Sequence, residues 1–151
     1  IFFSFLSLYK LRINSENDYW YLLFIIIICV ATDIGGYVFG KIFKGPKLSK
    51  ISPNKTYSGM IGGFLLSIIS VYIFMNNFLP TINTQINWFI LALLISCISQ
   101  LGDIIISYFK RKKKIKDTGK IIPGHGGLLD RIDGMIFAFP FSYIIFLTDL
   151  I

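Results

Sequence analysis

Long apolar runs alternate with short polar segments along most of the chain. Four long runs occupy residues 19–40, 57–78, 86–106 and 134–151, and a shorter one occupies 1–8. Each long run falls within the roughly 17–25 residues that a helix needs to cross a bilayer. Helices and closed barrels alone satisfy the backbone in lipid, and continuous rather than alternating apolar residues favour helices. We therefore predict an all-α, polytopic integral membrane protein with about four full transmembrane helices and a partial N-terminal one.

The polar segments predict the loops of a single membrane domain over residues 1–151. Thirteen of the fifteen Lys and Arg residues lie in 41–55 and 110–131, whereas 10–18 and 76–87 carry little or no net charge. Segment 10–18 is expected to be a short loop. Because these loops alternate along the chain, the positive-inside rule predicts that 41–56 and 107–131 are cytoplasmic loops.

Composition narrows the class of protein. A chain that is 54% hydrophobic, with a mean hydropathy of +0.69, is too apolar for an ordinary soluble domain. The net charge of +7 raises the question of nucleic acid, but the basic residues adjoin membrane segments. We therefore attribute the charge to an anionic head group, a nucleotide or simple membrane topology, and expect no nucleic acid as partner. Cys29 and Cys97 lie inside apolar runs and are expected to be buried free thiols.

Residues 100–133 hold the densest charge in the chain: four of its eight acidic residues, eight of its fifteen basic residues and its only histidine. Gln100, Asp103 and Ser107 are spaced i, i+3, i+7, which places them on one face of a helix. Asp130 and Asp133 are spaced i, i+3 and would share a face if the last helix began near Leu128. Carboxylates from two such helices suit Mg²⁺, which completes its coordination with water and substrate phosphates.

Simpler interpretations exist for part of this stretch and for Asp33. Lys112 to Lys114 are explained by membrane topology alone, and His125 by a structural hydrogen bond in a tight loop. Asp33 lies near the end of the first long run, where it is either hydrated at the interface or a functional acid within the membrane.

The longest motif of the chain comprises Ser107, Lys110-Arg111, Lys116-Asp117, Gly119, Pro123, His125-Gly126-Gly127, Asp130-Arg131 and Asp133. An upstream motif runs from Ser52 through Thr56. In these motifs the chain resembles the phosphatidate cytidylyltransferase family, also called CDP-diacylglycerol synthase, and the resemblance runs from Asp33 to Gly134. The chain departs from the family at Ser58, where Glu is frequent, and at Ile106, where an acid is frequent. Family members are usually about twice as long, so the chain is similar to their C-terminal catalytic half.

The resemblance implies an enzyme that transfers CMP from CTP to phosphatidate, giving CDP-diacylglycerol and pyrophosphate, at the cytoplasmic face of a bacterial membrane. It implies Mg²⁺ as cofactor, with a second cation left open, CTP and membrane phosphatidate as partners, and a homodimer left open. The catalytic residues would be Asp103, Ser107, Asp130 and Asp133, of which the three aspartates would hold metal. Substrates would contact Ser52, Lys55, Thr56, Lys110, Arg111, Lys116, Asp117, His125, Gly126, Gly127 and Arg131.

The alternative is an ion-coupled transporter, or a membrane protein that binds anionic lipid, in which Asp33 and Asp103 couple ions to a substrate. That alternative gives no reason for a glycine–histidine loop followed by Asp130 and Asp133. We therefore favour the enzyme.

Overall fold

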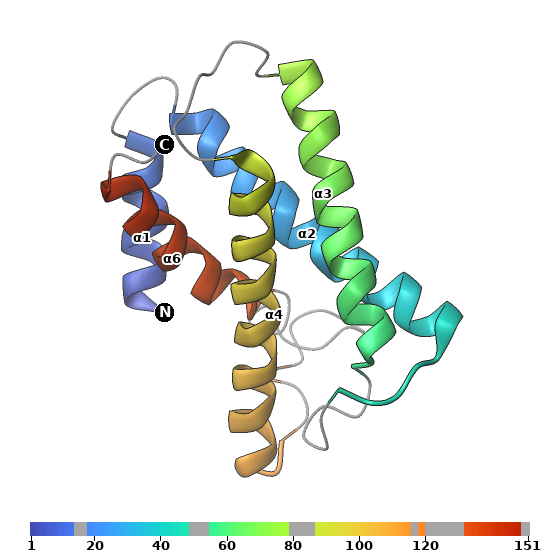
Figure 1. Cartoon of the computed structure of the whole chain (residues 1–151). Helices are drawn as coiled ribbons and strands as arrows, with labels where there is room; N and C mark the ends of the chain where they lie inside the picture. The colour runs from blue at the N-terminus through green and yellow to red at the C-terminus, as the bar shows by residue number, and fades with distance from the viewer. Residues whose placement is uncertain (14–17, 49–54, 79–86, 116–117, 120–131, 149–151) are drawn as a thin grey trace.

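The computed structural model describes residues 1–13, 18–48, 55–78, 87–115, 118–119 and 132–148. The named elements there are five helices, together with one isolated β-bridge between Lys47 and Thr56. The helices are α1 (Phe2–Ile13), α2 (Asp18–Phe43), α3 (Tyr57–Phe78), α4 (Trp88–Lys112) and α6 (Met135–Leu147) (Figure 1). The predicted all-α class is confirmed.

Helices α2, α3 and α4 are long and apolar enough to cross a membrane. The bounds of α3 coincide with the predicted run, whereas α4 continues to Lys112, beyond the expected end at residue 106. The Asn87 side chain caps the start of α4 by accepting a hydrogen bond from the Phe89 backbone N–H at 3.0 Å. Basic residues in its last turn complement the helix dipole. The beginning of the predicted 107–131 loop is therefore helical.

The first and last helices differ from expectation. Helix α1 continues to Ile13, so the prediction of a loop over 10–18 is wrong for its first residues. The reason is packing: Leu11 is fully buried, and the Ser4 hydroxyl donates a 2.7 Å hydrogen bond to the Ile136 carbonyl of α6. Helix α6 has 13 residues, a length of about 20 Å against a hydrocarbon core of about 30 Å. The described residues thus contain three full-length spans and one shorter apolar helix.

Helices α1 and α6 lie on one side of α4 and α3 lies on the other, while α2 passes behind α4 and contacts all four of these helices (Figure 1). The most extensive helix contact joins α2 to α3, where glycines let the two backbones approach closely. A β-carbon on Gly59 would lie 2.6 Å from the Gly36 carbonyl oxygen, so this crossing requires glycine. The buried apolar core includes Phe24, Ile28 and Leu91.

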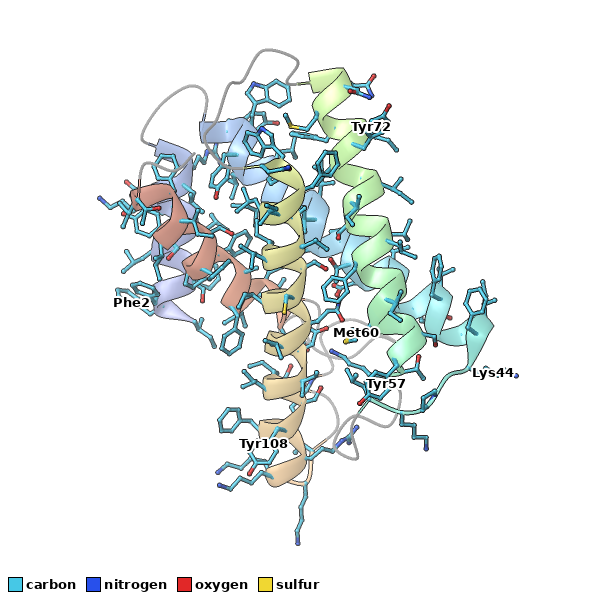
Figure 2. The ribbon with its side chains drawn as sticks, in the orientation of Figure 1. Phe2, Lys44, Tyr57, Met60, Tyr72 and Tyr108 are labelled. Carbon is cyan, nitrogen blue, oxygen red and sulfur yellow. The ribbon has the colours of Figure 1, made fainter. Side chains whose placement is uncertain are left out.

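The outer face of α3 is apolar and exposed. Ile61, Leu65, Ile69 and Tyr72 follow one another at helical spacing along it, and Tyr72 points outwards (Figure 2). Apolar side chains that face outwards along a helix of this length are suited to contact with lipid. The structure thus agrees with the predicted membrane class.

Candidate active site

A cavity of about 380 Å³ opens where α2, the start of α3 and the second half of α4 meet. This volume lies in the range of about 300–1,000 Å³ that is usual for small-molecule sites. Its lining residues come from α2, from the segments around the start of α3, from α4 and from the turn before α6: Thr32, Asp33, Gly36, Tyr37, Leu48, Lys55, Thr56, Gly59, Met60, Gln100, Asp103, Ser107 and Asp133.

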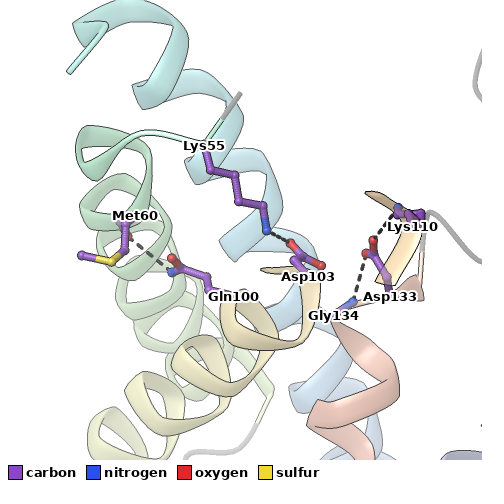
Figure 3. Close-up of polar contacts among 7 residues, drawn as sticks. All are labelled: Lys55, Met60, Gln100, Asp103, Lys110, Asp133 and Gly134. Carbon is purple, nitrogen blue, oxygen red and sulfur yellow. Dashed lines mark hydrogen bonds and ion pairs between the residues drawn. The ribbon is translucent and has the colours of Figure 1, made fainter. Parts of the chain in front are cut away.

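The polar face of α4 reaches this cavity as its spacing predicts. Gln100, Asp103 and Ser107 all line it. The Gln100 amide donates a 3.4 Å hydrogen bond to the Met60 carbonyl, which links α4 to α3 (Figure 3). Asp103 lies between Gln100 and Ser107 on this face, so its carboxylate is the central acidic group of the cavity wall.

Asp103 pairs with Lys55, which comes from the segment before α3. The Lys55 Nζ lies 2.8 Å from the Asp103 Oδ2 atom (Figure 3). The other carboxylate oxygen, Oδ1, is buried and has no hydrogen-bond partner among the described residues. A buried carboxylate oxygen without a partner is costly, because it has lost its hydration without compensation. Asp103 therefore has one oxygen available to a further cation or donor.

Asp133 lies in the turn directly before α6, facing the end of α4. Its Oδ2 atom is 3.5 Å from the Lys110 Nζ, and its Oδ1 atom accepts a 3.0 Å hydrogen bond from the Gly134 backbone N–H (Figure 3). Burial raises the pKa of the Asp133 carboxyl to about 8, and the neighbouring Asp103 carboxylate adds to the increase, against the opposing effect of Lys110 and Lys55. Additional positive charge between the two carboxylates would therefore stabilise their ionised forms.

These two carboxylates fit a hard divalent cation. Mg²⁺ is usually held by one or two carboxylates, with water and substrate phosphates as its other ligands. The partnerless Asp103 oxygen and the neighbouring Asp133 provide that donor set. No group of three or more His, Cys, Asp or Glu side chains that could hold a metal occurs within the described residues. Asp130 lies outside those residues, so its part in metal binding stays a prediction.

The backbone around Lys55 pairs with the backbone of residues 46–48 through two hydrogen bonds. The Leu48 N–H donates to the Lys55 carbonyl at 2.8 Å, and the Tyr57 N–H donates to the Pro46 carbonyl at 3.1 Å. Thr56 caps α3, because its hydroxyl oxygen accepts a 3.1 Å hydrogen bond from the Gly59 N–H. Thr56 thus fixes the start of α3, and it also lines the cavity, where the sequence predicted a substrate contact.

Two further predicted residues, Asp33 and Arg111, lie within the described part of the chain, and eight lie outside it. Asp33 lines the cavity from α2 and has no hydrogen bond or ion pair among the described residues. Arg111 is exposed near the end of α4 and is absent from the cavity lining, so its phosphate contact stays a prediction. The predicted residues that lie outside the described part are Ser52, Lys116, Asp117, His125, Gly126, Gly127, Asp130 and Arg131.

Several residues of the site were not assigned a role from the sequence, and Gly134 and Tyr37 are two of them. A β-carbon on Gly134 would lie 2.9 Å from the Asp103 Oδ1 atom and 2.5 Å from the Ser99 Oγ atom, so glycine is required for α6 to begin this close to α4. Tyr37 also lines the cavity. Its i, i+4 spacing from Asp33 is the signal that could have identified it, because residues so spaced share a helix face.

Fold and cavity together define a polytopic helical membrane protein with paired carboxylates and lysines in a site at the start of α3. Comparison with known proteins identifies it more closely. Residues 1–148 match the family model described as "Cytidylyltransferase family", and the chain belongs to that family.

Individual relatives carry a more specific name. The chain is 38% identical over 145 residues to the phosphatidate cytidylyltransferase of Brucella suis biovar 1, covering 94% of this chain and 52% of the relative. It is 39% identical over 145 residues to that of Rickettsia conorii, covering 90% and 60%, and 42% identical over 130 residues to that of Haemophilus influenzae, covering 83% and 45%. The chain thus spans about half the length of the curated relatives it matches.

Proposed function

We propose that this chain carries the catalytic half of a phosphatidate cytidylyltransferase, which transfers CMP from CTP to phosphatidate at the cytoplasmic membrane face. Family membership and the names of the relatives support this reaction. The observation that carries the proposal is the pair of carboxylates, Asp103 and Asp133, each opposite a lysine at one cavity. Such an arrangement suits two phosphate-bearing substrates and a divalent cation.

In the proposed reaction, a phosphate oxygen of phosphatidate attacks the α-phosphorus of CTP. The bond between the α-phosphorus and its bridging oxygen to the β-phosphorus breaks, and pyrophosphate leaves. Lys55 and Lys110 can neutralise charge on the phosphates, because both ammonium groups already reach the cavity carboxylates. Mg²⁺, held by Asp103 and Asp133, would polarise phosphoryl oxygens and stabilise the leaving pyrophosphate. Ser107 lines the cavity one turn beyond Asp103 and can donate a hydrogen bond to a phosphate there.

The direct test is incorporation of radiolabelled CTP into lipid by the purified protein in mixed micelles containing phosphatidate and Mg²⁺. The label should enter a chloroform-soluble product, with release of one pyrophosphate for each labelled lipid. Diacylglycerol in place of phosphatidate should give no product, since it lacks the attacking phosphate. Release of CMP or CDP into the aqueous phase without labelled lipid would contradict the proposal.

The orientation is testable by cysteine labelling in sealed vesicles. With Cys29 and Cys97 replaced by serine, single cysteines at Lys47 and Lys113 should react with a membrane-impermeant maleimide from the cytoplasmic face only. A cysteine at Thr81 should react from the opposite face only. If the cysteines at 47 and 81 are labelled from the same side, the proposed topology is wrong.

The basic residues at the end of α4 should differ in their contributions to rate. The Lys110 side chain is 14% exposed and faces Asp133, whereas Lys113, beyond the last helical residue, is exposed. A contact that strengthens in the transition state contributes about 3 kcal/mol, or about 10²-fold in rate. A lysine that attracts only the lipid surface contributes about 1 kcal/mol and is screened by salt.

We therefore expect Lys110→Ala to reduce turnover by about 10²-fold at every ionic strength. Lys113→Ala should reduce turnover a few-fold, mainly at low salt on anionic vesicles. Turnover of both variants should be measured from low to high salt at saturating CTP. Equal, salt-sensitive losses in the two variants would show that both lysines act only through surface attraction.

A further inference from the structure

Lys55 pairs with one of the acids proposed to hold a cation. Its ammonium group lies 2.8 Å from Asp103, whose other carboxylate oxygen is buried without a partner among the described residues. A lysine ammonium and a divalent cation are alternative ways to balance the same carboxylate. A divalent cation that binds Asp103 would therefore compete with the Lys55 ammonium group for this carboxylate.

The local structure allows the Lys55 side chain to move while its backbone stays fixed. The Leu48 N–H bonds to the Lys55 carbonyl and the Tyr57 N–H bonds to the Pro46 carbonyl, so the backbone is held at Lys55 and two residues after it. The side chain itself is 30% exposed, and its ion-pair partner at the cavity is Asp103. Lysine carries its charge on a flexible four-carbon chain with three rotatable N–H donors, so it can exchange one oxygen partner for another.

We infer that Lys55 is an exchangeable counter-ion of Asp103. It balances the carboxylate while the cavity holds no divalent cation, and it is displaced from Asp103 when the cation binds. The released ammonium group then stays inside the cavity and meets the phosphates of the nucleotide. The identity of those phosphates rests on the proposed function, whereas the exchange at Asp103 does not.

The exchange predicts that Lys55 weakens metal binding, whereas an ion pair with a purely structural role predicts no such effect. If Lys55 competes with the cation for Asp103, removal of its charge must strengthen metal binding. Lys55→Met should therefore bind Mn²⁺ roughly three- to tenfold more tightly than the wild type, as expected for loss of a partly exposed ion pair. Lys55→Arg should bind Mn²⁺ more weakly, because a guanidinium can engage both carboxylate oxygens at once.

Mn²⁺ binding to the purified protein can be measured by the loss of the free-ion electron paramagnetic resonance signal. Lys41→Met is the matched control, since Lys41 contacts the exposed Tyr37 ring and hydroxyl rather than a carboxylate. That control should leave the Mn²⁺ affinity within about twofold of the wild type, as an exposed charge beyond the cavity is screened. Unchanged or weaker binding by Lys55→Met would overturn the inference.

A second measurement follows Lys55 directly in the wild-type protein. Acetylation of lysines by a limiting amount of acetic anhydride, read by peptide mass spectrometry, should increase at Lys55 by at least twofold when Mg²⁺ is added. It should decrease again when CTP follows, and Lys41 should not change. Choline chloride at matched ionic strength controls for screening. Equal Lys55 acetylation with and without bound metal, or no metal binding by the wild type, would overturn the exchange.

The outcomes separate this inference from the proposed function. Labelled lipid formed from CTP, with Lys55 acetylation insensitive to metal, would leave the transferase proposal standing and end the exchange. Metal-dependent Lys55 acetylation without any labelled lipid would support the exchange and contradict the transferase proposal.

Discussion

Replacing Asp103 with asparagine should reduce CMP transfer at least about 10²-fold, because it removes the charged oxygen donor at the centre of the cavity. Asparagine has the same shape, so the packing of α4 against Gly134 should persist. Lys55 would lose its ion-pair partner, but it is partly exposed and its ammonium group can remain hydrated. The expected result is a folded protein in which Mn²⁺ binding is strongly weakened and CMP transfer is reduced by at least about 10²-fold.

The measurement is labelled-lipid formation across a range of Mg²⁺ concentrations, together with Mn²⁺ binding and the midpoint of thermal unfolding in detergent. Asp18→Asn is a control of the same chemical kind at the start of α2 and should leave all three unchanged. Near-normal transfer by the Asp103 variant at low Mg²⁺ would contradict the assignment of Asp103 to the cation.

The second large effect is expected at the α2–α3 crossing. A methyl group on Gly59 would meet the Gly36 carbonyl oxygen at 2.6 Å, whereas one on Gly36 would lie 3.8 Å from its nearest neighbour, the Gly59 carbonyl oxygen. Forcing extra volume into a close contact costs about 1–3 kcal/mol. Alanine recovers up to about 1 kcal/mol through its higher helix propensity.

Gly59→Ala should therefore lower the unfolding midpoint in detergent, and it should also lower transfer activity because Lys55 and Thr56 lie directly before α3. Gly36→Ala, at the same crossing, should leave the midpoint unchanged or raise it slightly. Thermal unfolding of the two variants side by side tests the difference. Equal midpoints would show that the helices separate to accommodate the methyl group without cost.

Local information accounts for the helices and for one face of the site. The apolar runs determine α2 and α3 because continuous apolar residues of that length have only one way to satisfy their backbone in lipid. The spacing of Gln100, Asp103 and Ser107 likewise determines a shared face, since helical periodicity is a property of the local backbone. All three side chains line the cavity.

Helix ends were less predictable because they depend on contacts between distant segments. The polar residues after Leu8 suggest a loop, but α1 continues through Leu11 because that side chain is fully buried in the core. The length of α6 was overestimated because hydropathy alone cannot locate a helix end. Helix α4 ends later than predicted because the basic residues of its last turn complement the helix dipole and stabilise that turn.

By itself, the sequence determines that this is a helical membrane protein and that it shares the motifs of its family. It also determines that most of the basic residues lie in segments 41–55 and 110–131. The tertiary structure alone decided that Lys55 pairs with Asp103, that Lys110 pairs with Asp133, and that Gly134 must be small. The physical reason is distance along the chain: Lys55 and Asp103 are 48 positions apart, and no local pattern encodes their meeting. It follows from the close α2–α3 crossing and from the packing of α4 against both α3 and α6.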